Sequence, residues 1–297
     1  MDAGWHGKSR GGKTGYRIFV FLIRHTGLAP AYCLLAFVAL YFIPASASST
    51  AAVWAYARKM LKYGRVKSAL FVYGNYFSFG RSIIDKFAIS AGLSGKFRYE
   101  FEGEECLREV LDSRGGAIVL SAHFGNWAAG ASFFEKYRAK MNMVMFDNEH
   151  ADIKKVMEDN RNGNASFKMI PVNGDSLAHI FMITEALDRG ELVCFMGDRY
   201  VDGSRLLETP FMGRPAEFPS GPFLLASRMN VPVVFYWSER ERNRTYRFKF
   251  FRAACFTEKK KSAGELLKEY AGSLEREVRL HPEQWYNYYD FWNLRDE

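Results

Sequence analysis

The sequence predicts an α/β fold: an αβα sandwich with a central, mostly parallel sheet, preceded by an apolar N-terminal helix. Three observations support this prediction. Between residues 97 and 281, short apolar runs alternate with segments of helical periodicity, as in folds where each strand is followed by a crossover helix. Hydrophobic residues make up 48% of the chain, with 26 Phe and 16 Tyr, which is enough for a large core. Finally, the stretch from Thr26 to Pro44 contains no charged residue.

The N-terminal region divides into a basic part and an apolar part. Residues 1–17 are rich in glycine and carry only Lys and Arg besides one Asp as charged residues, whereas the charge-free stretch that follows is roughly as long as a bilayer core is thick. The positive-inside rule places such a basic end in the cytoplasm. A helix lying flat in the interface and a buried core helix stay open as alternatives. We expect a basic N-terminus and membrane-anchoring helix over residues 1–48, and one further domain over 49–297.

Helices in the first half of this domain are predicted where apolar residues recur every three to four positions, and strands where apolar residues alternate or run continuously. The glycine pair after the segment "GEECLREVLDSR" marks the end of a helix. In chain order we predict helix 51–90, strand 97–103, helix 103–116, strand 117–123, helix 126–138, strand 141–147, helix 151–163 and strand 167–172.

The second half continues the alternation and contains a long loop. The loop is predicted because Gly and Pro recur through the segment "DGSRLLETPFMGRPAEFPSGP". The charged segment "ERERNRT" is typical of a hairpin turn between two apolar runs. In chain order we predict helix 176–190, strand 191–198, loop 199–222, helix 222–230, strand 231–237, turn 239–245, strand 246–256, helix 263–281 and an aromatic tail.

Charge and cysteine content limit the classes of partner. Lys and Arg outnumber Asp and Glu by 41 to 33, a net charge of +8, which favours an anionic partner such as a membrane surface, an acidic carrier protein or a phosphorylated substrate. The chain has no nucleic-acid-binding motif, so we expect no nucleic-acid partner. The four cysteines form no CxxC pair, which argues against a zinc site or a disulfide framework and favours a reducing compartment.

Polar residues follow two of the predicted buried strands. His123 ends the run "AIVLSAH", and Asp198 and Arg199 follow the run "ELVCFMG". In open α/β sheets, sites form at the carboxyl ends of the strands. Since the pKa of histidine lies near neutrality, His123 at such a position is a candidate general base that accepts a proton from a substrate hydroxyl. A structural histidine whose hydrogen bonds are satisfied is the alternative.

The residues around His123 are part of a wider resemblance. "LSAHFGNW" resembles the first block of the lysophospholipid and lipid A late acyltransferases, in which His is followed by four residues and then Asp or Glu. The segment that begins "DRYVDGSRLLETPFMGRPAEF" is similar to the later blocks of that family, and "HPEQWYNYYDFW" is similar to its C-terminal signature. The basic opening with its apolar anchor is also similar to bacterial members. The likeness covers most of the chain in the right order.

This resemblance implies transfer of a fatty acyl group from an acyl thioester to a hydroxyl or amine of a membrane lipid, such as a lipid A precursor or a lysolipid. His123 then deprotonates the acceptor, with no metal and no bound cofactor. The co-substrate is acyl-CoA or the acyl form of acyl carrier protein. By resemblance to this family, the fold is like that of the glycerol-phosphate acyltransferases. The expected location is the cytoplasmic face of the cell inner membrane. A lipid-binding protein that retains the fold without catalysis is the alternative.

The sequence departs from this family at position 128, where Ala128 stands in place of the expected Asp or Glu. A carboxylate beside a catalytic histidine holds the ring tautomer, and disabling it in another enzyme class costs roughly 10⁴ in rate. By analogy we expect activity here to be lowered on the order of 10²–10⁴. Three explanations stay open: replacement of the carboxylate by engineering, recruitment of another acid such as Asp198, or a chain that is no longer an enzyme.

Weaker predictions concern six further residues. Asn126 fixes the turn after the histidine or donates to an oxyanion. Asp198, together with Arg199, orients the ring of His123 or binds a phosphate or carrier group, and a salt bridge at the strand end is the alternative. The remaining four are expected at the substrate, where arginine holds anionic groups by paired hydrogen bonds. They are Arg161, Arg199, Gly213 and Arg214. We expect the aromatic tail over 285–292 to be core or membrane-interface packing.

Overall fold

The computed structural model describes residues 18–19, 21–23, 25–112, 115–127, 129–130, 139–146, 167–172, 177–200, 203–229, 231–254 and 262–294. The predicted helix over 151–163 lies outside these residues, and so does most of the predicted helix over 126–138. The described helices are α2 (Leu28–Ala45), α3 (Ala47–Ala55), α4 (Arg65–Ala88), α5 (Glu104–Asp112), α8 (Ala178–Asp188), α9 (Ser220–Arg228) and α10 (Ala263–Leu280). Short π or 3-10 turns are η1 (Tyr56–Met60), η2 (Ile89–Leu93), η3 (Ser94–Lys96), η4 (Arg242–Arg244) and η6 (Pro282–Gln284).

A seven-stranded sheet forms the centre of the fold, in the order β1-β9-β8-β2-β5-β3-β4. All neighbouring strands are parallel except β8 and β9, which form the predicted hairpin. This arrangement confirms the predicted α/β class with a mostly parallel sheet. The strands are β1 (Arg98–Glu102), β2 (Ala117–Ser121), β3 (Met141–Phe146), β4 (Phe167–Val172), β5 (Leu192–Met196), β8 (Val233–Arg240) and β9 (Thr245–Arg252).

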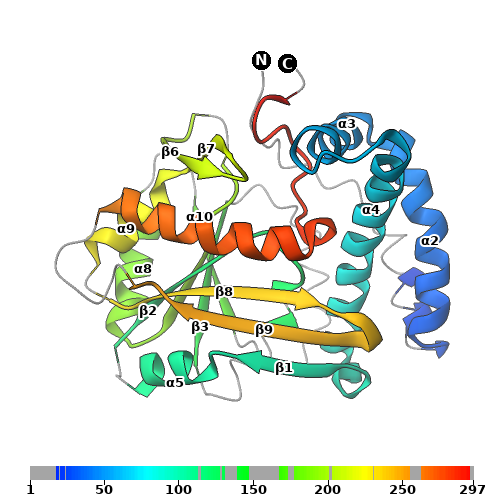
Figure 1. Cartoon of the computed structure of the whole chain (residues 1–297). Coiled ribbons are helices and arrows are strands. Elements are labelled where there is room, and N and C mark those ends of the chain that lie inside the picture. The colour runs from blue at the N-terminus through cyan, green and yellow to red at the C-terminus, as the bar shows by residue number, and fades with distance from the viewer. Residues whose placement is uncertain are drawn as a thin grey trace.

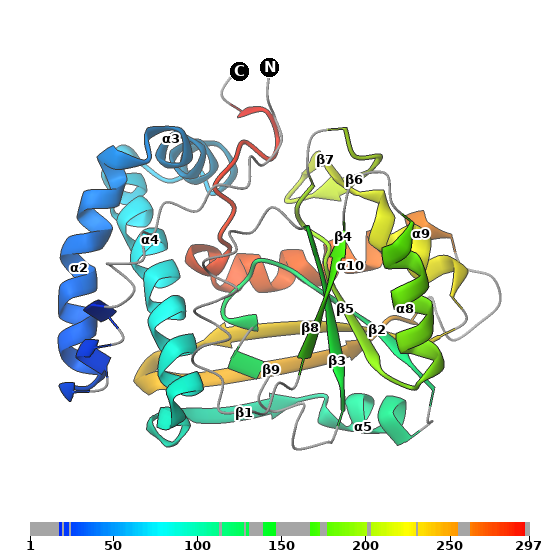
Figure 2. The same cartoon turned by 180° about the vertical axis from the view of Figure 1, so that it is seen from behind.

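Both faces of the sheet are covered. The central strand β2 is buried along its whole length, and its side chains alternate between two core clusters. Ile118 and Leu120 pack with residues of α8, α9 and α10, whereas Ala117 and Val119 pack with residues of α4 and α5. Figure 1 shows α10 along one face of the sheet and α5 on the other side, and Figure 2 shows α8 and α9 from behind.

A two-stranded hairpin occupies part of the segment predicted as a loop. β6 (Leu206–Phe211) and β7 (Arg214–Pro219) pair antiparallel, so the loop prediction was wrong for these residues. The connecting residues Met212 and Gly213 both have positive φ, at 55° and 84°, which is the geometry of a tight type I′ hairpin turn. The prolines in both strands are part of the reason why a loop was predicted here. They are tolerated because each strand of a two-stranded ribbon is an edge strand.

The N-terminal apolar stretch forms α2, which lies beside α4 at one end of the sheet (Figure 1, Figure 2). Among the described residues, α2 is the one helix long and apolar enough to cross a membrane. The two helices pack closely: a Cβ atom at Gly80 of α4 would lie only 2.2 Å from Leu35 Cδ1 of α2. A side-chain hydrogen bond from Tyr32 to Asp85 also joins the two helices. Sequence periodicity predicted one helical region over 51–90, and the chain instead breaks it near Tyr63.

Candidate active site at the ends of β2 and β5

The register of two parallel strands brings the predicted site residues together. β2 and β5 are neighbours in the sheet, and Ser121 is paired with Met196 at their carboxyl ends. His123 and Asp198 each follow their strand by two residues. The two side chains therefore leave the same edge of the sheet at the same level, which is where sites form in this fold class.

Asp198 holds His123 by three hydrogen bonds. Its Oδ1 atom lies 2.8 Å from Nδ1 of the His123 ring, and both carboxylate oxygens accept from the backbone N–H of His123 at 3.0 Å. Asp198 is 1% exposed, whereas 29% of the His123 side chain is exposed. The ring is thus fixed through Nδ1 by a buried carboxylate and reaches the surface of the protein.

The pKa of Asp198 shows that this carboxylate is charged. Burial on its own raises the pKa of a carboxyl group, because it disfavours the ionised form. Here the charge and hydrogen bonds of His123, together with the charge of Arg199, outweigh burial and hold the pKa of Asp198 below its usual value. An ionised Asp198 keeps the proton of the neutral ring on Nδ1, so that Nε2 is the nitrogen that can accept a proton.

The C-terminal segment after α10 completes the environment of Asp198. Trp285 donates its indole N–H to Asp198 Oδ2 at 3.1 Å, and the Tyr289 hydroxyl donates to the Asp198 carbonyl at 3.2 Å. The backbone N–H of Tyr286 donates to the carbonyl of His123 at 2.9 Å. The aromatic tail is therefore core, as expected, but it also supplies polar contacts to the site, which the sequence analysis missed.

The turn after His123 requires glycine. Gly125 has a φ of 60°, and a Cβ atom there would lie 1.6 Å from the carbonyl oxygen of Ser238. The Gly125 N–H donates to the carbonyl of Gln284 at 2.8 Å, and the Asn126 N–H donates to that of Ser238 at 3.1 Å. The turn is therefore seated against β8 on one side and the C-terminal segment on the other.

Asn126 fixes this turn with its side chain. Its Nδ2 donates to the carbonyl of Ser82 at 3.0 Å and to the hydroxyl of Tyr246 at 3.1 Å, while its Oδ1 accepts from the backbone of Ala129 at 3.2 Å. Asn126 is 4% exposed. Because both hydrogens of the amide have acceptors inside the protein, this geometry favours the turn-fixing role over donation to an oxyanion.

A buried polar network continues from Asn126 to the N-terminal helix. Asp85 accepts from the Tyr246 hydroxyl at 2.5 Å and from Arg240 Nε at 2.6 Å, and it also pairs with Tyr32 of α2. Asp85 is fully buried, so these partners supply the hydrogen bonds that a buried carboxylate needs. The network joins α2, α4, β8 and β9 behind the turn that carries His123.

The predicted substrate-binding residues are not all gathered at His123. Arg199 does lie at the site, because its guanidinium donates to the carbonyl of Tyr286 beside Asp198. Gly213 and Arg214 lie at the turn of the β6–β7 hairpin, whose Phe211 ring lies 5.5 Å from the ring of Trp285. Their contact with substrate stays a prediction. Ala128 and Arg161 lie outside the described residues, and so their predicted roles stay predictions too.

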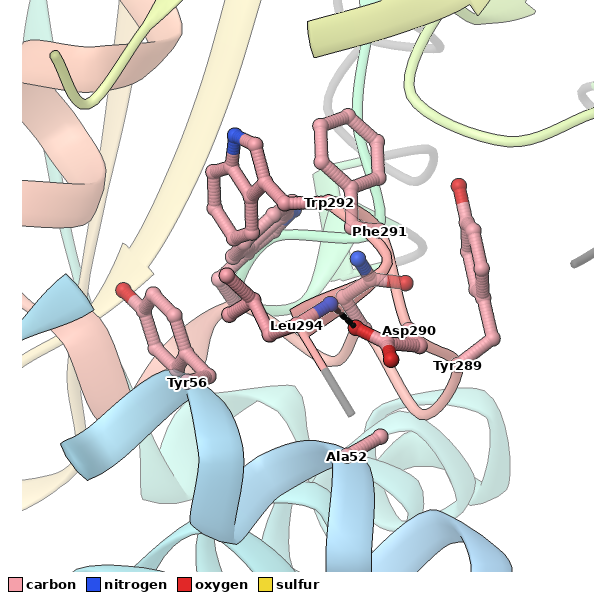
Figure 3. Close-up of a pocket in the computed structure, with 9 residues that line it drawn as sticks. Ala52, Tyr56, Tyr289, Asp290, Phe291, Trp292 and Leu294 are labelled. Atoms are coloured by element: carbon pink, nitrogen blue, oxygen red, sulfur yellow. Dashed lines mark hydrogen bonds between the residues drawn. The ribbon is translucent and has the colours of Figure 1, made fainter. Parts of the chain in front are cut away.

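A small cavity lies next to the site, on the far side of Trp285. It has a volume of about 10 Å³ and is lined by residues of α3, η1 and the C-terminal segment, including Tyr289 and Trp292 (Figure 3). The dashed bond in this view joins the Leu294 backbone N–H to Asp290 Oδ1 at 2.7 Å. The cavity has room for about one water molecule, so it is too small for a fatty acyl chain.

The family comparison decides the class of protein. The family model for bacterial lipid A biosynthesis acyltransferases matches residues 75–292, a range that contains His123, Asp198 and the C-terminal segment. The chain belongs to this acyltransferase family. No individual curated protein matches the chain. The family match confirms the resemblance inferred from the sequence blocks.

Membership in the lipid A acyltransferase family gives the general activity of the chain. The chain is an acyltransferase of the lipid A biosynthesis type. The family and the apolar helix α2 together suggest association with a membrane. Within the candidate site, the contributions of Trp285 and Tyr289 had no sequence signal beyond the C-terminal block in which they stand.

Proposed function

We propose that this acyltransferase moves a fatty acyl group from an acyl thioester to a hydroxyl or amine of a membrane lipid, with His123 as general base. The observation that carries this proposal is the bond of 2.8 Å between His123 Nδ1 and Asp198 Oδ1, on a ring whose side chain is 29% exposed. A buried carboxylate on Nδ1 is the arrangement that leaves Nε2 as the proton acceptor. We assign Asp198 as the carboxylate that orients the ring.

The reaction then has two steps. Nε2 of His123 takes the proton of the acceptor hydroxyl or amine as its oxygen or nitrogen attacks the thioester carbonyl, and the carbon becomes tetrahedral. The intermediate collapses, the bond between carbon and sulfur breaks, and the imidazolium returns the proton to the leaving thiolate. Asp198 stabilises the imidazolium between the two steps. The products are the acylated lipid and a free thiol, and the enzyme forms no covalent intermediate.

The acyl donor in this proposal is acyl-CoA or acyl carrier protein, and the acceptor is a lipid A precursor or a lysolipid. The net charge of +8 supports an encounter with an acidic carrier protein and with an anionic membrane surface. The apolar helix α2 supports placement at a membrane, which we propose is the inner membrane with the site on its cytoplasmic face. We propose residues 1–48 as the membrane-anchoring part and 49–297 as the acyltransferase domain.

Ala128 lowers but does not abolish activity in this proposal, because Asp198 still supplies a carboxylate to the ring. The test compares three forms of the chain: the sequence as it stands, Ala128→Glu, and Ala128→Glu combined with His123→Ala. Consumption of acyl-CoA and of acyl-loaded carrier protein is measured with a bacterial lipid extract.

We expect Ala128→Glu to be the fastest of the three forms, the sequence as it stands to be slower by an order of 10²–10⁴, and the double variant to be inactive. Equal rates of consumption in all three forms would contradict the role of His123. That outcome would favour a lipid-binding protein that has kept the acyltransferase fold.

A further inference from the structure

A partly exposed arginine near the site has one buried nitrogen that finds no hydrogen-bond partner among the described residues. Arg81 lies in α4, and its Nε atom is buried without a partner among the described residues. Its guanidinium carbon lies 5.8 Å from the centre of the Phe77 ring. The side chain is partly exposed, so a ligand can reach it. A buried N–H group without an acceptor costs free energy, so a ligand oxygen that accepts from Nε would be bound favourably.

The nearest carboxylate cannot neutralise Arg81, because another arginine already uses it. Asp85 forms an ion pair of 2.6 Å with Arg240 Nε and accepts from Tyr246 as well. Arg81 lies near both members of this pair, and its pKa is lowered by burial first and by the charge of Arg240 second. Among the described residues the cluster therefore holds two guanidinium groups and one carboxylate, with one positive charge in excess.

Two neighbours of Arg81 contact the turn that carries His123. Tyr286 lies close enough to Arg81 for the arginine charge to lower the pKa of its hydroxyl group, although burial raises that pKa more strongly. The backbone N–H of Tyr286 donates to the carbonyl of His123 at 2.9 Å. On the other side of Arg81 in α4, the carbonyl of Ser82 accepts from Asn126 in the turn after His123. Tyr286 and Ser82 are therefore the two residues that connect the surroundings of Arg81 to the turn after His123.

We propose that Arg81 binds a phosphate group of the substrate at this site. A phosphate monoester brings up to two negative charges and a doubly esterified phosphate brings one, and a guanidinium binds either with paired hydrogen bonds. Binding would pair the buried Nε and offset the excess charge. The inference rests on the proposed function, because a lipid acceptor with a phosphorylated head group and a thioester donor with a phosphopantetheine arm both carry a phosphate.

The test measures binding rather than turnover. Calorimetry compares two pairs of probes: short-chain phosphatidic acid against the matching diacylglycerol in detergent micelles, and 4′-phosphopantetheine against pantetheine. The proteins are the chain as it stands, Arg81→Gln, Arg81→Lys and the control Arg65→Gln, which removes an exposed arginine from the same helix. We expect the unaltered chain and Arg65→Gln to prefer the phosphorylated probe of at least one pair.

In Arg81→Gln this preference should fall about ten- to hundredfold, as for the loss of a hydrogen-bonded charge pair, and Arg81→Lys should keep part of it. A preference confined to phosphatidic acid identifies the acceptor phosphate, and one confined to 4′-phosphopantetheine identifies the donor phosphate. No preference in the unaltered chain, or an undiminished preference in Arg81→Gln, would overturn the inference.

A second measurement separates ligand binding from a structural role. Without ligand, Arg81→Gln should unfold at the same temperature as the unaltered chain or at a higher one, because it removes a buried Nε–H group that has no acceptor among the described residues. A lower unfolding temperature would show that Arg81 supports the fold and would overturn the inference. The proposed function fails by a different result, namely that neither the chain as it stands nor Ala128→Glu consumes an acyl thioester.

Discussion

Trp285 donates its indole N–H to Asp198 Oδ2 over 3.1 Å, from a position 87 residues further along the chain. The bond holds the carboxylate that in turn holds His123. We expect Trp285→Phe to keep most of the ring packing and to lower kcat about tenfold, as for the loss of one hydrogen bond to a charged group. The measurement is steady-state acyl-thioester consumption.

Trp292→Phe is the matched control for this prediction. The indole N–H of Trp292 is buried near the same residues but has no hydrogen-bond partner in the part of the chain that the structure describes. Removing it should leave kcat unchanged. Equal losses of kcat in the two variants would assign the effect to ring packing instead of to the bond with Asp198.

Asp198→Asn tests the orienting carboxylate itself. The amide has nearly the same shape, but it carries no charge and it can present a donor to His123 Nδ1, which favours the wrong ring tautomer. By analogy with base–carboxylate pairs in other enzymes, we expect kcat to fall on the order of 10²–10⁴. Asp188→Asn, at an exposed position at the end of α8, is the control and should leave kcat unchanged. A fall of less than threefold in Asp198→Asn would contradict the assignment.

The turn after His123 gives a prediction about stability. Gly125 and Gly213 both have positive φ, but only at Gly125 would a Cβ atom collide with the backbone, 1.6 Å from the Ser238 oxygen. Gly213→Ala should lower the free energy of unfolding by roughly 1 kcal/mol, from backbone strain alone. Gly125→Ala should lower it by several times as much and abolish acyl transfer, because the turn must move. Denaturant unfolding of both variants checks this, and equal losses would contradict it.

The ion pair of His281 with Glu239 predicts a dependence of stability on pH. The two side chains lie 3.2 Å apart, and Glu283 and Lys249 also act on the ring. The hydrogen bond from His281 to Glu239 raises the pKa of His281 above 6.5, although burial opposes it. A histidine whose pKa is raised by folding stabilises the protein fully below pH 6.5, and this stabilisation is lost as the pH rises through the folded-state value.

We therefore expect His281→Asn to unfold at a lower temperature than the unaltered chain at pH 6, and the difference to shrink at pH 9. His179→Asn is the control, because His179 forms no ion pair with any part of the chain that the structure describes. A difference that is the same at both pH values would show that the charge of His281 is not what stabilises the protein.

Much of the fold and the centre of the site could be predicted from the sequence. Continuous apolar runs located β2 and β5, and the polar residues directly after them located His123 and Asp198. The apolar runs do not reveal the order in which the strands lie in the sheet. β2 and β5 are neighbours although β3 and β4 lie between them in the chain, and only this pairing puts the two side chains in contact.

Other parts of the site had no pattern that could reveal them. The contribution of Trp285 depends on one indole N–H, and an aromatic residue near a chain end looks the same whether it packs or donates. The network of Asp85, Tyr246 and Arg240 joins residues more than 150 positions apart in the chain. Such a contact leaves no periodic pattern in the sequence. It forms because a buried carboxylate needs hydrogen-bond partners, wherever in the chain they come from.

The hydrogen bonds from Trp285, Tyr286 and Tyr289 also fix when the site comes into being during translation. A ribosome has already delivered the strands that carry His123 and Asp198 before it reaches these three residues. A nascent chain that has already formed the sheet still lacks these three hydrogen-bond donors to Asp198 and His123. The newly made protein therefore completes this candidate site last, after every strand of the sheet has been synthesised.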